Sequence, residues 1–411
     1  MSRPSRLRIL FVAPYVPSRI RVRPFQFIRH LARAGHRVTV VALSDGLPSE
    51  DALAELREIC ESVHVVPHPK WRAAARCVLA LPTATPLWAA FCHSPAMARL
   101  LRGLVTSGEF DVAHVEHLRA AHWAPALRGL PAVFDAVDCI TSLRRQMLDQ
   151  KQGSVPGRLL AYEEWVKLRR YEPRAYRRFP QIVVTSEHDA GELAKLDRAM
   201  EGIRVIPNGV DLDYFRPRAA EPKPWSLVFT GKMSYAANDD AARFLAGEVL
   251  PRLRRRIPQA TLTIAGSGPG PALRALAERD PGIEVTGYVD DLRPYLSAAA
   301  VSVSPIRIGV GIQNKVLEAM AMGRPVICSP LASRALVGAG RVGAVRVAGD
   351  ADEFADACAH LLQHAEEAAV MGAAARRYVE EHHRWECAAE DLVSLYDAVR
   401  NPAEGGFGCH D

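Results

Sequence analysis

The residues best suited to chemistry lie in turns that directly follow short apolar, strand-like runs in the second half of the chain. One turn, FTGK at residues 229–232, carries Gly231 and Lys232, and another, AGSGPG at 265–270, is rich in glycine. Ligands of open parallel sheets bind at the carboxyl ends of the strands, where glycine lets the backbone approach closely and a lysine can neutralise a phosphate. Either turn alone also fits an ordinary surface turn, and 265–270 lacks the spacing and the later acidic residue of a dinucleotide-binding fingerprint.

A third turn, after the strand-like run at 301–304, is the most informative. Its loop carries Gly309 and Gly311 and leads into a helix-like stretch. The loop amides and the helix N-terminus offer hydrogen bonds and partial positive charge to a diphosphate, and Arg307 or Lys315 adds a full charge. Glu318 follows Lys315 on the same helix face, where its carboxylate can accept hydrogen bonds from ribose hydroxyls. A surface ion pair between these two residues is the alternative interpretation.

The sequence KVLEAMAMGRPVI, at residues 315–327, resembles the donor-site signature of retaining GT-B glycosyltransferases of the fourth family, the glycosyltransferase group 1 type. Other motifs of that family follow in its order, and the resemblance extends from about residue 7 to 400. It is greatest to a branch found in bacterial exopolysaccharide gene sets. The supporting motifs are GHRVTV (35–40), DVAHVE (111–116), PNGVD (207–211), FTGK, GYV (287–289), IQNK (312–315) and the late Trp385.

This resemblance implies a hexosyltransferase that moves a sugar, with retention and without a metal or cofactor, from a nucleotide diphosphate sugar to an acceptor. A saccharide, a lipid-linked acceptor and a natural product remain open. The implied donor-binding residues are Gly231, Lys232, Gly266, Val289, Arg307, Gly309, Gly311, Asn314, Lys315 and Glu318. The implied catalytic residues are Glu116, His117, Lys232 and Lys315.

The chain departs from the family pattern at three places. Val310 stands where the family usually has a first glutamate, and Ala237 replaces a second basic residue. Glu116, with His117 beside it, occupies the place where a sugar-contacting histidine is common. Two alternatives therefore stay open. A GT-B sugar-nucleotide epimerase would draw its acid and base from Glu116, His117, Asp135 and Asp138, and a non-catalytic GT-B scaffold would explain Val310.

Strand-like and helix-like segments alternate twice along the chain, which predicts two Rossmann-like, doubly wound parallel-sheet domains, the α/β class and the GT-B architecture. We expect an acceptor-side domain at 1–210 and a nucleotide-sugar domain at 211–384. A helix at 385–400 is expected to cross back to the first domain, and a glycine-rich tail at 401–411 is expected to be disordered. Within the second domain the pattern predicts one continuous helix over 239–255.

The charge is unevenly distributed: residues 1–210 hold 30 Lys+Arg against 20 Asp+Glu, and 211–411 hold 22 against 26. No zinc-finger spacing or RNA-recognition motif accompanies the basic half, so nucleic acid is not an expected partner. An anionic membrane surface is, because residues 157–178 read as a helix rich in arginine and aromatic residues. The alternative is a solvated helix whose charges pair with Glu163, Glu164 and Glu172.

Eight scattered cysteines, without a Cys-x-x-Cys pair, indicate reduced thiols. We therefore expect a cytoplasmic protein, with peripheral association at the inner face of the membrane as a further expectation. The uncharged stretch at 77–98 is long enough for a membrane span, but Pro82, Pro86 and Pro95 interrupt it and favour a packed region near the acceptor site.

Overall fold

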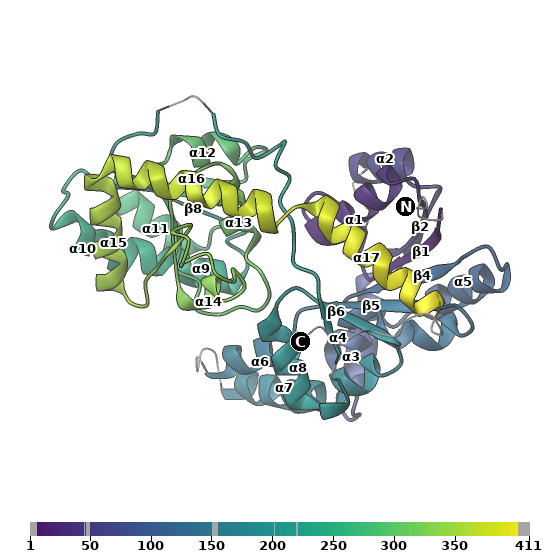
Figure 1. Ribbon diagram of the computed structural model, residues 1–411. Coiled ribbons are helices and arrows are strands. Elements are labelled where there is room, and N and C mark those ends of the chain that lie inside the picture. The colour runs from purple at the N-terminus through teal and green to yellow at the C-terminus, as the bar shows by residue number, and fades with distance from the viewer. Residues whose placement is uncertain are drawn as a thin grey trace. The chain divides into compact units, whose positions relative to one another are not determined.

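The structure is a computed structural model that describes residues 6–44, 46, 50–149, 155–200, 202–218 and 221–401. The chain forms two compact units (Figure 1). The first consists of Met1–Pro207 with Trp385–Asp411, and the second of Asn208–Arg384. From residue 402 on, the tail expected to be disordered lies outside the described residues.

Unit 1 is built on a parallel sheet with the strand order β3-β2-β1-β4-β5-β6-β7. Its strands are β1 (Arg8–Ala13), β2 (Arg37–Ser44), β3 (Ser62–Pro67), β4 (Val112–Glu116), β5 (Ala132–Val137), β6 (Gln181–Val184) and β7 (Arg204–Val205). Alternate residues of β1 enter separate apolar clusters: Leu10 and Val12 pack in one, Ile9 and Phe11 in the other. Both faces of the sheet are therefore buried, which explains the nearly continuous apolar runs in the sequence.

Helices cover both faces of this sheet. They are α1 (Val22–Arg33), α2 (Glu50–Ile59), α3 (Lys70–Ala80), α4 (Leu87–Phe91), α5 (Pro95–Thr106), η1 (Leu118–Leu127), α6 (Ile140–Asp149), α7 (Val155–Tyr176), α8 (Glu187–Leu196), η2 (Arg198–Met200) and α17 (Trp385–Arg400).

The last helix, α17, packs on α1 of unit 1, as the sequence predicts (Figure 1). The Trp385 ring meets Phe27 edge to face with the centroids 5.5 Å apart. The Tyr396 hydroxyl hydrogen-bonds His114 Nδ1 over 2.9 Å. These aromatic residues are fully buried, so α17 is part of the core of unit 1 rather than an appendage.

Unit 2 repeats the architecture with a parallel sheet of order β10-β9-β8-β11-β12-β13. The strands are β8 (Ser226–Thr230), β9 (Thr261–Ala265), β10 (Ile283–Gly287), β11 (Val301–Ser304), β12 (Val326–Cys328) and β13 (Arg346–Val347). The helices are α9 (Ala236–Phe244), η3 (Leu245–Val249), α10 (Leu250–Arg254), α11 (Pro271–Arg279), α12 (Arg293–Ala298), α13 (Asn314–Ala321), α14 (Pro330–Ser333), α15 (Ala351–Gln363) and α16 (Ala365–His382). The prediction of two doubly wound parallel-sheet domains is thus confirmed.

One segment differs from the sequence expectation, and another is interrupted at prolines as the sequence predicts. The helix expected over 239–255 is interrupted by the π-helical turn η3, so its two ends are not in one α-helical register. The uncharged stretch at 77–98 forms the end of α3, all of α4 and the start of α5, with Pro86 and Pro95 at helix starts. No described helix has both the length and the apolar run needed to cross a bilayer.

Candidate active site

In unit 2 the chain order reverses between β8 and β11, which lie side by side in the sheet. The turn after β8 begins at Gly231, and the loop after β11 carries Gly309 and Gly311. Ligands of such sheets bind at the carboxyl ends of the strands where this reversal occurs. The topology therefore brings the first and third sequence motifs to one place.

The two glycine turns after β8 and β9 touch through their backbones. Gly231 has φ 153° and Gly266 has φ 144°, and the Gly231 amide donates to the Ala265 carbonyl over 3.0 Å. A Cβ atom on Gly266 would lie 1.8 Å from the Gly231 carbonyl oxygen. Glycine at Gly266 is therefore required by the close approach of the chain, not only by the turn.

Lys315 projects from the first turn of α13 toward the turn after β8. Its Nζ donates to the side-chain oxygen of Asn238, and the Asn238 amide in turn donates to the Lys232 carbonyl over 2.9 Å. Burial lowers the pKa of Lys315 to about 8, while the charge of Glu318 raises it. Lys315 is therefore a cation that its surroundings solvate poorly, and an anionic ligand would stabilise its charge. Lys232 itself is exposed.

Glu318 lies on the same helix, and burial raises its pKa to about 7, with Lys315 opposing the shift. The structure gives no ion pair between Glu318 and Lys315 among the contacts of the described residues. The surface ion pair offered as an alternative from sequence is thus not formed. The carboxyl group remains available to a ligand.

Two other residues of the predicted donor site have structural partners. Arg307 makes two hydrogen bonds to Asp240, of 3.0 and 2.8 Å, and lies over the Phe244 ring. The Asn314 side chain accepts a 2.9 Å hydrogen bond from Asn208, in the turn that opens unit 2. Arg307 would have to share its charge between Asp240 and a diphosphate, and Asn314 fixes the start of α13. Val289, which follows β10, is half-buried.

In unit 1 the corresponding reversal lies between β1 and β4. Glu116, the last residue of β4, is buried, and Tyr15 in the loop after β1 donates a 2.9 Å hydrogen bond to its Oε1. Its Oε2 has no hydrogen-bond partner among the described residues. Burial, assisted by the charge of Asp135, raises the pKa of Glu116 to about 8. At neutral pH Glu116 is mainly a protonated acid able to donate a hydrogen bond.

His117 follows directly and has an unusual backbone, with φ 71°. Such strain in a non-glycine residue is concentrated at functional sites. Its ring stacks on Trp88 with the centroids 5.8 Å apart, and its Nδ1 accepts from the Arg119 amide over 3.2 Å. Burial, then the charges of Arg119 and Arg21, lower its pKa to about 3, so the imidazole is neutral.

The other acidic candidates are engaged within the fold. Asp135 is fully buried and accepts from the Arg23 guanidinium over 2.7 Å. Asp138 accepts from the Thr185 hydroxyl over 3.0 Å, and burial followed by the charge of Asp189 raises its pKa to about 7. The Arg23 ion pair leaves Asp135 poorly suited to proton transfer, and no observation favours the epimerase alternative.

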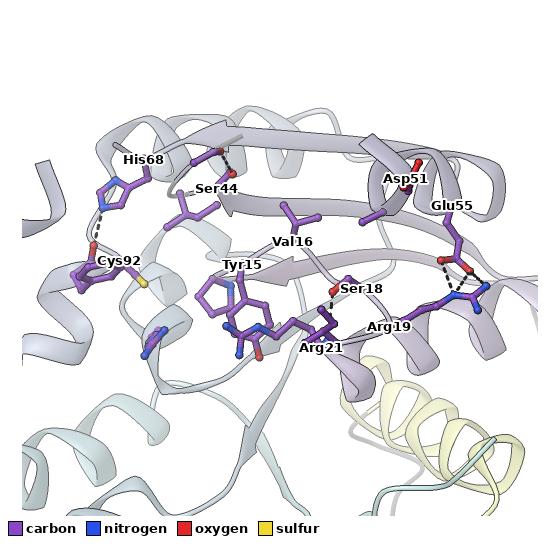
Figure 2. Close-up of a pocket in the computed structure, with 17 residues that line it drawn as sticks. Tyr15, Val16, Ser18, Arg19, Arg21, Ser44, Asp51, Glu55, His68 and Cys92 are labelled. Atoms are coloured by element: carbon purple, nitrogen blue, oxygen red, sulfur yellow. Dashed lines mark hydrogen bonds and ion pairs between the residues drawn. The ribbon is translucent and has the colours of Figure 1, made fainter. Parts of the chain in front are cut away.

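A pocket of about 520 Å³ opens at the carboxyl ends of β1, β2 and β3 in unit 1 (Figure 2). Tyr15 and Arg21 face it beside Ser18 (Figure 2). Arg19 pairs with Glu55 over 2.8 Å on its rim. The remaining lining residues are Pro14, Val16, Ile20, Leu43, Ser44, Gly46, Asp51, Ala52, His68, Phe91, Cys92 and Arg119.

Several of these residues could not be found from sequence motifs. Asn238, which positions Lys315, lies 77 residues away in the chain, and Tyr15 lies 101 residues from Glu116. Only the fold brings these partners together. The fold also brings together three potential metal ligands that no sequence motif indicates. His360, His364 and Glu367 have ligand atoms within 4.8 Å of one another where α15 meets α16.

Two family models match the chain. The model described as Glycosyltransferase Family 4 matches residues 22–214, and the model described as Glycosyl transferases group 1 matches residues 224–364. The first lies almost entirely in unit 1 and the second entirely in unit 2.

Curated relatives have related names. A GDP-mannose-dependent alpha-(1-6)-phosphatidylinositol monomannoside mannosyltransferase of Mycobacterium tuberculosis is 30% identical over 53% of this chain and 63% of its own length. A D-inositol 3-phosphate glycosyltransferase of Saccharomonospora viridis is 29% identical over 53% of this chain and 55% of its own length. These matches span less than two thirds of each relative. The glycogen synthase of M. tuberculosis is 27% identical over 90% of this chain and 88% of its own length.

Solved structures share the fold at low identity. The sucrose-phosphate synthase of Thermosynechococcus elongatus covers 96% of this chain and all of its own, with a TM-score of 0.70 at 17% identity. The Anabaena protein HepE, in complex with UDP and glucose, covers 95% of this chain and all of its own, with a TM-score of 0.69 at 14% identity. The two matched family models together span more than half of the chain, which therefore belongs to the family 4, group 1 type of glycosyltransferases.

Proposed function

We propose that the protein transfers a sugar, with retention and without a metal, from a nucleotide diphosphate sugar held by unit 2 to an acceptor held by unit 1. The observation that carries the donor half is the convergence of the Gly231 turn, the α13 N-terminus and the poorly solvated Lys315 at the strand reversal of unit 2. Backbone amides, a helix N-terminus and a cation together suit a diphosphate.

Each residue has a distinct role in this proposal. Lys315 and the exposed Lys232 stabilise the negative charge that builds on the leaving diphosphate, with the amides of the loop that contains Gly309 and Gly311. Glu318 accepts hydrogen bonds from the ribose. The backbone around Val289 holds the base, which the name of one relative suggests is guanine and the UDP complex of HepE suggests is uracil.

In unit 1, Glu116 and His117 are the proposed groups nearest the acceptor. Glu116 is protonated at neutral pH and therefore donates a hydrogen bond to the acceptor. His117 makes a second hydrogen bond to the acceptor as a neutral imidazole. The Tyr15 hydroxyl holds the Glu116 carboxyl in place. This arrangement replaces the sugar-contacting histidine common in the family.

The acceptor class expected from the exopolysaccharide-type resemblance includes lipid-linked saccharides, so we include peripheral binding to an anionic membrane in the proposal. Support comes from exposed apolar side chains on two helices that also carry exposed basic residues. Lys167 of α7 donates to the Leu81 carbonyl, over 2.7 Å, just after α3, so the two helices lie close together. The large exposed apolar residues on α3 are Trp71, Val78 and Leu79, and those on α7 are Val155, Leu159, Leu160 and Tyr162. The exposed basic residues are Lys70, Arg72 and Arg76 on α3 and Arg158, Arg169, Arg170 and Arg174 on α7.

The alternative interpretation of α7 is a solvated helix whose positive charge is neutralised by its own acidic residues, and only one of these three residues pairs with a described basic residue of the helix. Glu163 pairs with Lys167, but Glu164 accepts from the Leu87 amide over 2.8 Å, and Glu172 accepts from the Thr141 amide over 2.8 Å. Two of the three carboxylates are thus committed to backbone amides. Much of the positive charge of α7 is left for solvent or an anionic surface.

A thermal-shift panel of UDP, GDP and their sugar conjugates tests the donor half of the proposal. A ligand that binds only the native state raises the melting temperature, by an amount that increases with its concentration relative to Kd. We expect a rise with one nucleotide family that is reduced in Glu318→Gln and unchanged in Glu284→Gln, an exposed carboxylate of β10. Equal shifts in all three proteins would contradict the assigned site.

A further inference from the structure

The pocket of unit 1 contains more positive charge than its carboxylates neutralise. Of its two carboxylates, Glu55 is engaged by Arg19 with hydrogen bonds of 2.8 to 3.2 Å. Arg21 and Arg119 have no carboxylate in ion-pair distance among the contacts of the described residues. Charge complementarity alone therefore favours an anionic occupant.

Both arginines are supported by aromatic rings instead of acids. The Arg21 guanidinium lies 4.5 Å from the Tyr15 ring centroid, and the Arg119 guanidinium lies 4.6 Å from that of Trp88. Arg144 lies over the same Trp88 ring at 4.8 Å. Stacking uses the flat face of a guanidinium and leaves the N–H groups on its edge free to bind an oxyanion through two hydrogen bonds.

Arg119 has a second, independent feature. Its Nε atom is buried and has no hydrogen-bond partner in the described part of the chain. A buried donor without an acceptor is costly, and native proteins rarely leave one unless a ligand or water supplies the acceptor. The donor therefore marks a place where an acceptor atom belongs.

The two arginines act on the same neighbours. Both lower the pKa of the His117 imidazole and oppose the increase in the pKa of Tyr15. Tyr15 in turn holds Glu116, the proposed acid. The positive region therefore borders the groups assigned to the acceptor, as Figure 2 shows for Arg21 and Tyr15.

From these observations we infer that the pocket binds the phosphate of a phosphorylated acceptor through Arg119 and Arg21. The inference rests on the proposed function only in taking the ligand to be the acceptor. The pocket volume of about 520 Å³ suits a group the size of a sugar or polyol phosphate, and Val16, Leu43 and Phe91 add apolar surface around it. A phosphate anchored there would supply binding energy remote from the reacting hydroxyl.

Isothermal titration calorimetry with two matched pairs of probes tests this inference. Glycerol 3-phosphate and glycerol form the soluble pair, and phosphatidic acid and diacylglycerol in detergent micelles form the lipid pair. We expect at least one phosphorylated probe to bind ten times more tightly than its neutral counterpart. The pair that shows this preference identifies whether the phosphate belongs to a soluble or a lipid acceptor. No preference in either pair would overturn the inference.

Variants locate the binding. Arg119→Met should weaken binding of the phosphorylated probe at least tenfold, and Arg21→Met should weaken it as well, with little risk to folding because Arg21 is exposed. Arg169→Met, which removes another arginine stacked on a tryptophan, Trp165, is the matched control in the soluble pair. Lys315→Met reports any phosphate bound at the donor site. Binding that survives both pocket variants, or that only Lys315→Met removes, would refute the pocket assignment.

UDP and GDP binding to the same preparations separates this inference from the proposed function. Loss of phosphate binding with nucleotide binding intact would refute the phosphate pocket alone. Selective phosphate binding without any nucleotide binding would support the pocket and contradict the proposed transferase.

Discussion

Replacing Lys315 with methionine removes the cation that the structure places beneath the Gly231 turn. A Cβ on Gly231 would lie 3.4 Å from the Lys315 Cε atom, so the stem of the lysine lies close to this turn. Methionine is also unbranched and flexible, and it keeps an apolar stem there without the charge. The fold should therefore survive. With a pKa of about 8, Lys315 is charged in roughly 90% of molecules at pH 7.

The expected loss follows from the kind of contact removed. A hydrogen bond to a charged group contributes about 1.5–3 kcal/mol, so the Kd for UDP or GDP should rise about ten- to a hundredfold. Turnover of the full donor should fall further, because charge builds on the diphosphate as the sugar leaves. Lys223→Met, at an exposed lysine of the same unit, is the control and should change the Kd by less than about twofold.

The pH profile gives a second readout of the same variant. Nucleotide affinity of the unaltered protein should fall as the pH rises through about 8, because Lys315 then loses its proton. Lys315→Met should lack this alkaline decrease. Calorimetry at several pH values measures both effects. An unchanged Kd at pH 7, or an alkaline decrease that persists in the variant, would refute the role of Lys315.

Three further perturbations test other parts of the account. Gly266→Ala should destabilise unit 2 and weaken nucleotide binding, since the added Cβ would lie 1.8 Å from the Gly231 carbonyl oxygen. Gly247→Ala is the control, because the space around the added atom is open there. Melting curves should show a lower Tm only for Gly266→Ala. Glu116→Gln should lower kcat at least tenfold without changing nucleotide affinity. The pKa of Glu116 is raised in the folded protein, so its contribution to stability is fully present below pH 4.5 and is lost as the pH rises toward about 8. Glutamine does not titrate, so the Tm of the variant should rise relative to that of the unaltered protein between pH 4.5 and 8. Sedimentation should show binding to anionic but not neutral vesicles at low salt, and equal binding to both, or none, would exclude the membrane surface.

The two sheets were predictable because each is buried on both faces. Strands such as β8, in which Leu227, Val228 and Phe229 are consecutive and buried, therefore carry an unbroken apolar run and are easily recognised. The helix at 239–255 was wrong in detail, because a π-helical turn has no signature in the apolar periodicity. Alternation of strands with helices also predicted the doubly wound topology. Because ligands of such sheets bind at the carboxyl ends of the strands, it predicted on which side of each sheet the motifs meet as well.

The partners of the candidate residues could not be predicted, because they come from distant parts of the chain. Nothing near Arg307 in sequence shows that Asp240 engages it, and nothing near Glu116 shows that Tyr15 binds it. The same applies to charge state. Glu318 and Glu116 look like ordinary surface acids in the sequence, and only burial in the fold raises their pKa values.

Sugar transfer from a nucleotide diphosphate donor can be measured by incubating the protein with radiolabelled UDP- and GDP-sugars and separating the products. We expect release of UDP or GDP, with the label passing to an added acceptor or to water, and a loss of that release in Lys315→Met. Conversion of the donor to an epimer without nucleotide release, or no consumption of any donor, would contradict this expectation.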